Sequence, residues 1–309
     1  MSKITWLAAL GLPLHPAASA TPLRDLFLER VAERQANAGN AAGNSAGAAP
    51  FTLPQGSTVE RDIAYGNDPA QRLDVYRPAH AEGAPLIFMV HGGGWNQGDK
   101  GGLRAVKNKV THWVEKGYVL VSVNYRVLPQ ARPVEQANDV AKALVFAQSK
   151  ARTWGSDPAK FVLMGHSAGA HLVSLITADP SIAARLGAVP WLATISIDSA
   201  AFDVVEIMGR RHFGLYDKAF DQDPAYWREA SPIHRLTGKL SAPLLAVCSS
   251  RRNDSCPQAR AFAVKAESLG GRVQVLPVEL SHLEANDQLG SKGPYTDAVE
   301  GFMRSVGLQ

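Results

Sequence analysis

The chain has 309 residues and a formal net charge of +4, from 32 Lys and Arg against 28 Asp and Glu. The basic residues are scattered rather than gathered into a stripe, which argues against a nucleic-acid-binding surface. No apolar run beyond the N-terminus approaches the roughly 20 residues that span a bilayer, and the length suits one large domain with its own core.

The first 20 residues have the layout of a secretory signal peptide. Lys3 supplies the positive charge, residues 4–14 are mostly apolar, and Ala18-Ser19-Ala20 is a small-residue cleavage site. A buried N-terminal helix is the alternative. We therefore expect the protein to be exported, to the periplasm or out of the cell, with a mature chain that begins after residue 20.

Residues 21–57 are predicted to form a short helix followed by a flexible linker. Leu23, Leu26, Phe27 and Val31 share one helical face. Residues 35–56 are rich in Ala, Gly, Asn and Ser, a composition that buries little apolar surface. The folded domain is therefore expected to cover residues 58–309.

From residue 58 the pattern alternates between strands and helices. Strands are expected at 58–65, 72–77, 86–90, 118–123, 161–164, 193–197, 243–247 and 272–278, and helices at 103–116, 133–150, 257–269 and 295–306. The first two strands suggest an antiparallel start, and the later strands are apolar throughout. Such a pattern predicts an α/β fold: a mostly parallel sheet of about eight strands with helices on both faces. Residues 202–236 interrupt the alternation, as either a cap over one end of the sheet or a surface excursion.

Residues 165–169 form a G-x-S-x-G pentapeptide between a predicted strand and a predicted helix. On such a sharp turn the serine is forced outward with its hydroxyl exposed, while His166 and His171 should be turned away from it. A serine hydroxyl attacks a carbonyl only with a base, a carboxylate that orients the base, and donors for the oxyanion. Ser167 is the candidate nucleophile, and the other parts should lie elsewhere in the chain.

Residues 91–95, with the sequence HGGGW, directly follow the strand at 86–90. Consecutive glycines let backbone N–H groups turn toward a ligand, and such a segment after the third strand can form an oxyanion hole. A phosphate loop would need Lys-Ser or Lys-Thr after the last glycine, where this chain has tryptophan. We expect Gly93, Gly94 and Ala168 to supply the oxyanion donors, and Trp95 to contact the substrate.

The base and the acid are predicted from the chain order serine, acid, histidine. Among nine histidines, His282 follows both the serine and a late strand, so it is the expected base. Asp254 follows the strand at 243–247 and precedes a helix, the position at which the family that this chain resembles carries its acid, so Asp254 is the expected acid. Asp198 and Asp203, one strand earlier, and Glu279 are the alternatives.

Cys248 and Cys256 are the two cysteines of the chain, and they bracket Asp254. An even count in an exported chain indicates a disulfide, with two free thiols as the alternative. A bridge would stiffen the loop that carries the expected acid. Two cysteines supply too few ligands for a structural zinc site, and we expect no metal.

Together these motifs resemble α/β-hydrolase-fold carboxylesterases of the hormone-sensitive-lipase-like, bacterial feruloyl esterase and arylformamidase-like group. The matching segments are residues 91–95, 124–129, 165–172, 231–234 and 281–284, within residues 58–306. The resemblance implies a Ser167–His282–Asp254 triad without a cofactor, and hydrolysis of a small-molecule ester through an acyl-enzyme. An arylformamidase-type amidase with the same catalytic parts, and an inactive hydrolase-fold binding protein, are the alternatives.

Overall fold

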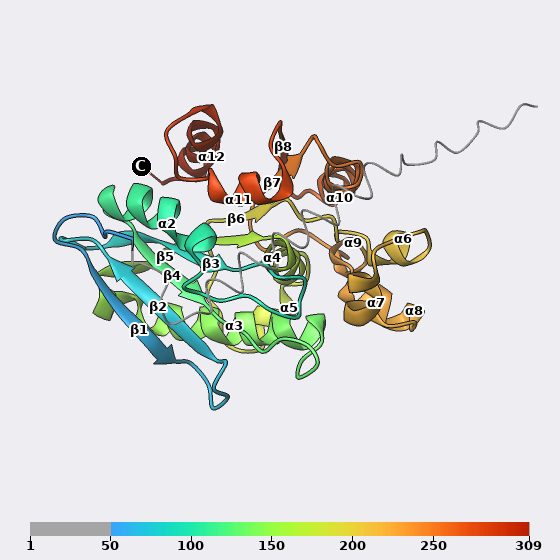
Figure 1. Cartoon of the computed structure of the whole chain (residues 1–309), viewed down its shortest axis with the longest axis horizontal. Helices are drawn as coiled ribbons and strands as arrows, with labels where there is room; N and C mark the ends of the chain where they lie inside the picture. The colour runs from blue at the N-terminus through green and yellow to red at the C-terminus, as the bar shows by residue number, and fades with distance from the viewer. Residues whose placement is uncertain (1–50, 309) are drawn as a thin grey trace, which may run out of the picture.

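Eight strands form one sheet at the centre of the molecule (Figure 1). The computed structural model describes residues 51–308; the predicted signal peptide and residues 21–50 lie outside the described residues. The strands are β1 (Thr58–Ala64), β2 (Arg72–Arg77), β3 (Ala84–Val90), β4 (Val119–Val123), β5 (Ser156–His166), β6 (Ala193–Ile197), β7 (Leu244–Ser249) and β8 (Val273–Val278). Their order across the sheet is β1-β2-β4-β3-β5-β6-β7-β8. β2 is antiparallel to β1 and β4, and the other neighbouring pairs are parallel, so the expected mostly parallel sheet is confirmed.

Helices cover both faces of this sheet, as predicted. One face carries η2 (Ala151–Trp154), α3 (Pro133–Lys150), α4 (Ala168–Ala178), α5 (Ser181–Ala184) and α10 (Ser255–Ser268). The other carries α2 (Leu103–Lys109), η1 (Val110–Val114), α11 (His282–Asp287) and α12 (Pro294–Ser305). The expected single helix at 103–116 is α2 followed by the wider π-helical turn η1, and the short α5 and α11 were not predicted.

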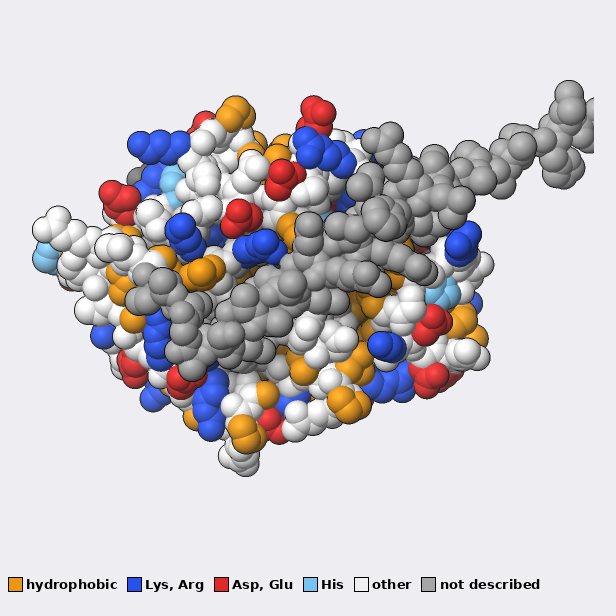
Figure 2. All heavy atoms as spheres, viewed as in Figure 1, with side chains coloured by type: hydrophobic (Ala, Val, Ile, Leu, Met, Phe, Trp, Pro, Cys, Tyr) orange, Lys and Arg blue, Asp and Glu red, His pale blue; other side chains and the backbone are white. Residues whose placement is uncertain are grey.

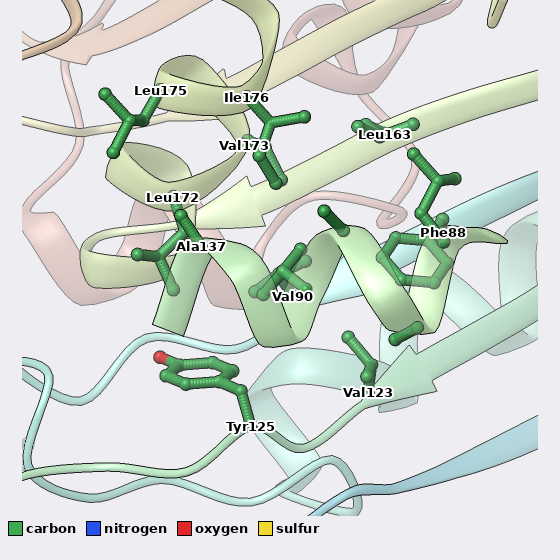
Figure 3. Close-up of a cluster of buried hydrophobic side chains, with 14 of the residues drawn as sticks. Phe88, Val90, Val123, Tyr125, Ala137, Leu163, Leu172, Val173, Leu175 and Ile176 are labelled. Carbon is green, nitrogen blue, oxygen red and sulfur yellow. The ribbon is translucent and has the colours of Figure 1, made fainter. Parts of the chain in front are cut away.

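Strand alternation divides the core into two layers. On β3, Phe88 and Val90 point to the side of α3 and α4, while Ile87 and Met89 point to the side of α2 and α12. Figure 3 shows the first layer, where side chains from α3 and α4 meet those of the central strands. Because both faces of the central strands are covered, apolar residues stand on both faces, with a few buried polar exceptions such as Ser122 of β4 and Ser196 of β6.

Four short helices make up the segment 202–236 that interrupts the alternation. They are α6 (Val204–Met208), α7 (Gly214–Phe220), α8 (Pro224–Ala230) and α9 (Pro232–Arg235), and they lie together at one end of the molecule (Figure 1). The Tyr226 hydroxyl lies 3.2 Å from the backbone nitrogen of Val134, which ties α8 to the start of α3. The segment is therefore a helical insertion packed on the domain, and its action as a cap stays a prediction.

The described part of the predicted linker contacts the domain. Phe51 and Leu53 pack against the core layer on the α12 side, and the Phe51 ring centroid lies 6.3 Å from that of Tyr76. Residues 51 and 53 of the predicted linker therefore pack against the domain.

Candidate active site

Ser167 lies on a tight turn between β5 and α4, as its pentapeptide predicted. Its φ of +55° is unusual for a residue other than glycine. The flanking glycines permit the turn: a Cβ at Gly165 would lie 2.4 Å from the Gly169 carbonyl oxygen, and one at Gly169 only 2.3 Å from the Val90 carbonyl oxygen. Larger residues at either position would push β3, β5 and α4 apart. The close packing therefore holds the serine at the carboxyl edge of the sheet.

His282 is the residue that meets Ser167. Its Nε2 lies 2.9 Å from the Ser167 Oγ, so the expected pairing of these two residues is present in the structure. His282 is the first residue of α11, where the Ser281 hydroxyl and the Glu284 carboxylate form a reciprocal capping box. The capping box stabilises a helix of only six residues at the end that carries the imidazole.

The carboxylate on His282 belongs to Asp198, so the expectation that Asp254 contacts this imidazole is wrong. Asp198 directly follows β6, and its Oδ2 lies 2.6 Å from the His282 Nδ1. Asp254 lies directly before α10 and pairs instead with Arg252, whose Nη2 is 3.2 Å from the Asp254 Oδ1. The Arg252 guanidinium thus holds Asp254, while its Nη1 lies 3.0 Å from the Asp198 Oδ2.

Asp198 is fully buried, and each of its carboxylate oxygens is hydrogen bonded. Oδ1 accepts from the backbone N–H of Ser249 at 2.6 Å and from the Ser255 hydroxyl at 2.5 Å, and Oδ2 accepts from Arg252 and His282. Burial alone would raise the pKa of Asp198. The positive charge of Arg252, followed by the hydrogen bonds from His282 and Ser255, outweighs burial and holds the pKa well below its usual range. Asp198 is therefore ionised wherever the protein is folded near neutral pH.

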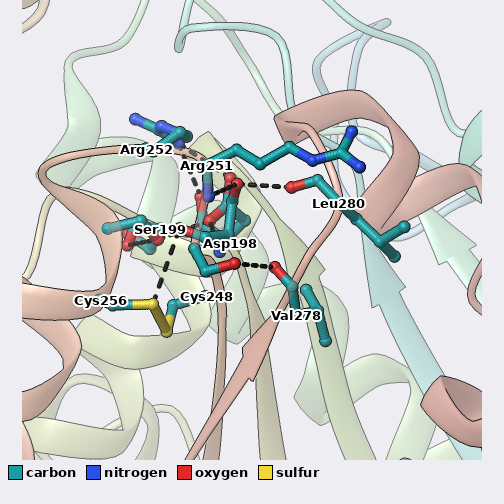
Figure 4. The surroundings of a disulfide bond; sticks show 11 residues. Asp198, Ser199, Cys248, Arg251, Arg252, Cys256, Val278 and Leu280 are labelled. Atoms are coloured by element: carbon teal, nitrogen blue, oxygen red, sulfur yellow. Dashed lines mark hydrogen bonds and ion pairs between the residues drawn. A yellow bond between two sulfur atoms is a disulfide. The ribbon is translucent and has the colours of Figure 1, made fainter.

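The Cys248–Cys256 disulfide closes the loop that surrounds Asp198 (Figure 4). The predicted bridge is present. Ser249 and Ser255, the donors to the Asp198 Oδ1, are the neighbours in sequence of the two cysteines, and Arg252 lies between them. The bridge therefore stiffens a loop that orients a carboxylate, but this carboxylate belongs to Asp198, directly after β6, and not to the loop itself.

Removing the bridge is expected to destabilise the fold. Replacing both cysteines with alanine should lower the free energy of unfolding by about 2.5 kcal/mol, the chain-entropy value for a loop this short. Urea unfolding of the variant and of the oxidised wild type measures the difference. Wild type unfolded in excess reductant should match the variant, and an unchanged midpoint would show that the bridge contributes no stability.

The glycine loop, residues 91–95, lies against the serine. A Cβ at Gly92 would be 3.0 Å from the Ser167 Cβ, and Gly93 and Gly94 have φ values of +132° and +58°. These positive values are ones that glycine adopts without strain. The His91 ring braces the loop, because its Nδ1 lies 2.7 Å from the Gly92 carbonyl oxygen and must donate to it. Gly93 and Gly94 directly follow this contact in the chain, and Ala168, the first residue of α4, directly follows Ser167, while their role as oxyanion donors stays a prediction.

Trp95 does not have the exposed position expected of a substrate contact. It is only 4% exposed and lies in an aromatic cluster with Tyr216 and Phe220 of α7. Its indole N–H donates to the His171 Nδ1 at 3.1 Å. Trp95 therefore anchors the glycine loop in the core, and it brings α7 of the insertion against this loop.

His171 is turned away from Ser167, as expected, and joins three elements as a neutral imidazole. Its Nδ1 accepts from Trp95, and its Nε2 lies 2.7 Å from the carbonyl oxygen of Ala230 in α8, so Nε2 carries the proton. Complete burial lowers the pKa of His171 to about 4. Protonation of His171 would place a second proton on Nδ1, so that two N–H donors, of His171 and of Trp95, would face each other.

The depressed pKa of His171 predicts a loss of stability in mild acid. The folded value lies below the usual 6.5, so the unfolded chain binds the proton first. The contribution of neutral His171 to the free energy of unfolding is therefore fully present above pH 6.5. It is lost as the pH falls toward 4, and the total loss is about 3 kcal/mol. Urea unfolding at several pH values should show a shallower loss for His171→Gln. Equal slopes for both proteins would contradict the assignment.

No sequence motif points to the groups that hold the Asp198 carboxylate. Arg252, Ser249 and Ser255 carry no motif, and their roles depend on a contact between the ends of β6 and β7. Asp198 carried a usable signal, because it directly follows a predicted strand of the parallel sheet.

In residues 51–308, no cluster of three or more His, Cys, Asp or Glu side chains is arranged to hold a metal ion. Across the same range, no helix has both the length and the apolar character needed to cross a membrane.

Comparison with known proteins places the chain among relatives named as esterases. Residues 73–186 match the BD-FAE family. The chain is 31% identical over 275 residues to esterase LipC of Mycobacterium tuberculosis, covering 80% of this chain and 65% of that protein. It is 31% identical over 175 residues to a probable isoprenylcysteine alpha-carbonyl methylesterase, ICMEL2, of Arabidopsis thaliana, covering 53% of this chain and 40% of that protein. The chain thus spans less than two thirds of the length of these relatives.

Solved structures show the same fold at low sequence identity. Esterase B from Lactobacillus rhamnosis superposes with a TM-score of 0.69 at 18% identity, over 92% of this chain and 94% of that one. A truncated carbohydrate esterase from gut microbiota superposes with a TM-score of 0.70 at 16% identity, over 84% and 99%. The chain therefore has the α/β-hydrolase fold, matches the BD-FAE family over residues 73–186, and is similar in sequence to proteins named as esterases.

Proposed function

We propose that the protein hydrolyses carboxylic esters, with Ser167 as nucleophile, His282 as base and Asp198 as acid. One observation carries the proposal: an unbroken hydrogen-bonded chain from the Ser167 Oγ through both ring nitrogens of His282 to the buried Asp198 carboxylate. The 2.9 Å and 2.6 Å distances along this chain are those at which a base can take the serine proton while a carboxylate fixes its tautomer.

The reaction follows from this arrangement. The His282 Nδ1–H donates a hydrogen bond to the Asp198 carboxylate, which leaves the Nε2 lone pair facing the Ser167 hydroxyl. The Ser167 Oγ attacks the ester carbonyl carbon as Nε2 takes its proton, and backbone N–H groups of Gly93, Gly94 and Ala168 receive the oxyanion. Nε2–H then protonates the leaving alcohol, and water activated by His282 hydrolyses the acyl-enzyme.

Ester substrates are favoured over N-formyl amides by the names of the relatives, several of which are esterases. An arylformamidase-type amidase would use the same three side chains. A binding protein without chemistry would have no use for a buried, ionised Asp198 aligned on His282 and Ser167. The intact proton path is the feature that separates a hydrolase from such a binding protein.

Labelling with a fluorophosphonate tests the proposal. The folded protein should be labelled once, with the modified peptide containing Ser167, and should release acid from short acyl and feruloyl esters faster than from an N-formyl aryl amine. Folded wild type that is neither labelled nor active on any of these substrates would rule out the hydrolase. Faster turnover of the N-formyl amine would mean that the protein is an amidase and not an esterase.

We also propose that the protein is exported. The signal-like residues 1–20 and the buried Cys248–Cys256 disulfide support this, since structural disulfides persist in oxidising compartments. Mass spectrometry of the protein from a fractionated host should give an N-terminus after Ala20 in the exported fraction. A full-length chain that stays in the cytosol would contradict the proposal.

A further inference from the structure

The three residues of the proposed triad are not anchored alike. Ser167 and Asp198 follow the adjacent strands β5 and β6, and the Ser167 N–H donates to the carbonyl oxygen of Ile197 at 2.9 Å. The sheet therefore fixes the nucleophile and the acid relative to each other. His282 follows β8, the edge strand two positions beyond β6, and begins a six-residue helix outside the sheet. No strand ladder fixes its distance from Ser167.

His166, the residue directly before the nucleophile, links the sheet to His282 by a direct hydrogen bond. Its Nε2 lies 2.9 Å from the backbone carbonyl oxygen of His282, and the two rings pack with centroids 4.6 Å apart. A carbonyl oxygen can only accept, so His166 Nε2 carries a proton and donates it. His166 is 5% exposed at the end of the central strand β5, so the donor is held in place by the sheet.

The His166 ring is also confined on its other side. A Cβ at Gly92 would lie 3.0 Å from the His166 Nδ1, so the glycine loop closes over this nitrogen. Burial, followed by the neighbouring His282, holds the pKa of His166 well below its usual range. The ring is therefore neutral near pH 7, with its single proton on Nε2. When His282 takes up a proton, the neutral His166 ring therefore does not place a second positive charge beside it.

We propose that His166 is a positioning residue that holds the backbone of His282 at the distance from Ser167 that proton transfer requires. The inference rests on the proposed function, because it assigns His282 as the base. It gives His166, the residue directly before the serine, a role in aligning the catalytic groups. A shift of about 1 Å at a reacting group can cost on the order of 100-fold in rate, so one backbone hydrogen bond at this point has a measurable effect.

Two substitutions separate the hydrogen bond from the packing. His166→Gln places an amide N–H near the position of Nε2, whereas His166→Leu fills a similar volume without a donor. For a short acyl ester, we expect His166→Leu to lower kcat by about 50-fold with KM within threefold of wild type, and His166→Gln to stay within fivefold of wild type. The rate of fluorophosphonate labelling should follow kcat. His112→Gln, which removes an imidazole bonded to Glu300 of α12, is the matched control and should leave both values unchanged.

Several outcomes would overturn the inference. These are equal losses of kcat for Gln and Leu, a loss confined to KM, or a Leu variant as active as wild type. If His166→Leu does not fold, as judged by circular dichroism, His166→Asn replaces it, because its shorter amide should not reach the His282 carbonyl oxygen. Wild type that is neither active nor labelled contradicts the proposed function itself, before any variant is compared.

Discussion

Replacing Asp198 with asparagine is expected to lower kcat by about 10⁴-fold, with a small change in KM. The Ser249 N–H, fixed by the backbone 2.6 Å from Oδ1, requires an oxygen at that position. The amide oxygen of asparagine will therefore take the place of Oδ1, and its NH2 group will face the His282 Nδ1. The imidazole must then accept at Nδ1 and carry its proton on Nε2, which presents a donor, not a base, to Ser167. Steady-state kinetics on a short acyl ester measures the loss.

Asp254→Asn is the matched control for this experiment. Asp254 pairs with the same Arg252 but has no bond to His282, so its replacement should change kcat by less than about tenfold. Circular dichroism of both variants should match that of the wild type. If Asp254→Asn lost more activity than Asp198→Asn, the acid would be Asp254, as the family resemblance had implied, and the assignment of Asp198 would fail.

The fold was predictable because its strands and long helices carry strong local patterns. The strands at 72–77 and 193–197 and the helix at 133–150 have the predicted bounds. A strand buried on both faces is apolar at most of its positions, so such a run is readily recognised in the sequence. The short helices α5 and α11, and the four helices of the insertion, have too few turns for a period to show, and tertiary contacts decide them.

The pairing of Ser167 with His282 was also predictable, and the carboxylate that contacts His282 was not. Ser167 is marked by its glycines, and His282 by its place after the last strand. Asp198 and Asp254 both follow parallel strands, so both reach the same edge of the sheet. The choice between them depends on Arg252, which pairs with Asp254 and also donates to Asp198. A long-range charge contact of this kind leaves no trace in spacing or periodicity.

Replacing Ser167 with alanine is expected to lower kcat by about 10⁶-fold, since no other group in the proposed mechanism forms the acyl-enzyme. The more informative result comes from the double variant. Asp198 acts only by setting the tautomer of His282, and His282 acts only by moving protons to and from the Ser167 Oγ. Once the Ser167 Oγ is removed, there is no proton transfer from serine for Asp198→Asn to slow. Ser167→Ala with Asp198→Asn should therefore be no slower than Ser167→Ala alone, although the two single losses multiply to about 10¹⁰-fold. The residual rate of both proteins, measured at high enzyme concentration, checks this. A further loss in the double variant would mean that Asp198 contributes by a route that does not pass through Ser167, such as direct stabilisation of charge on the substrate.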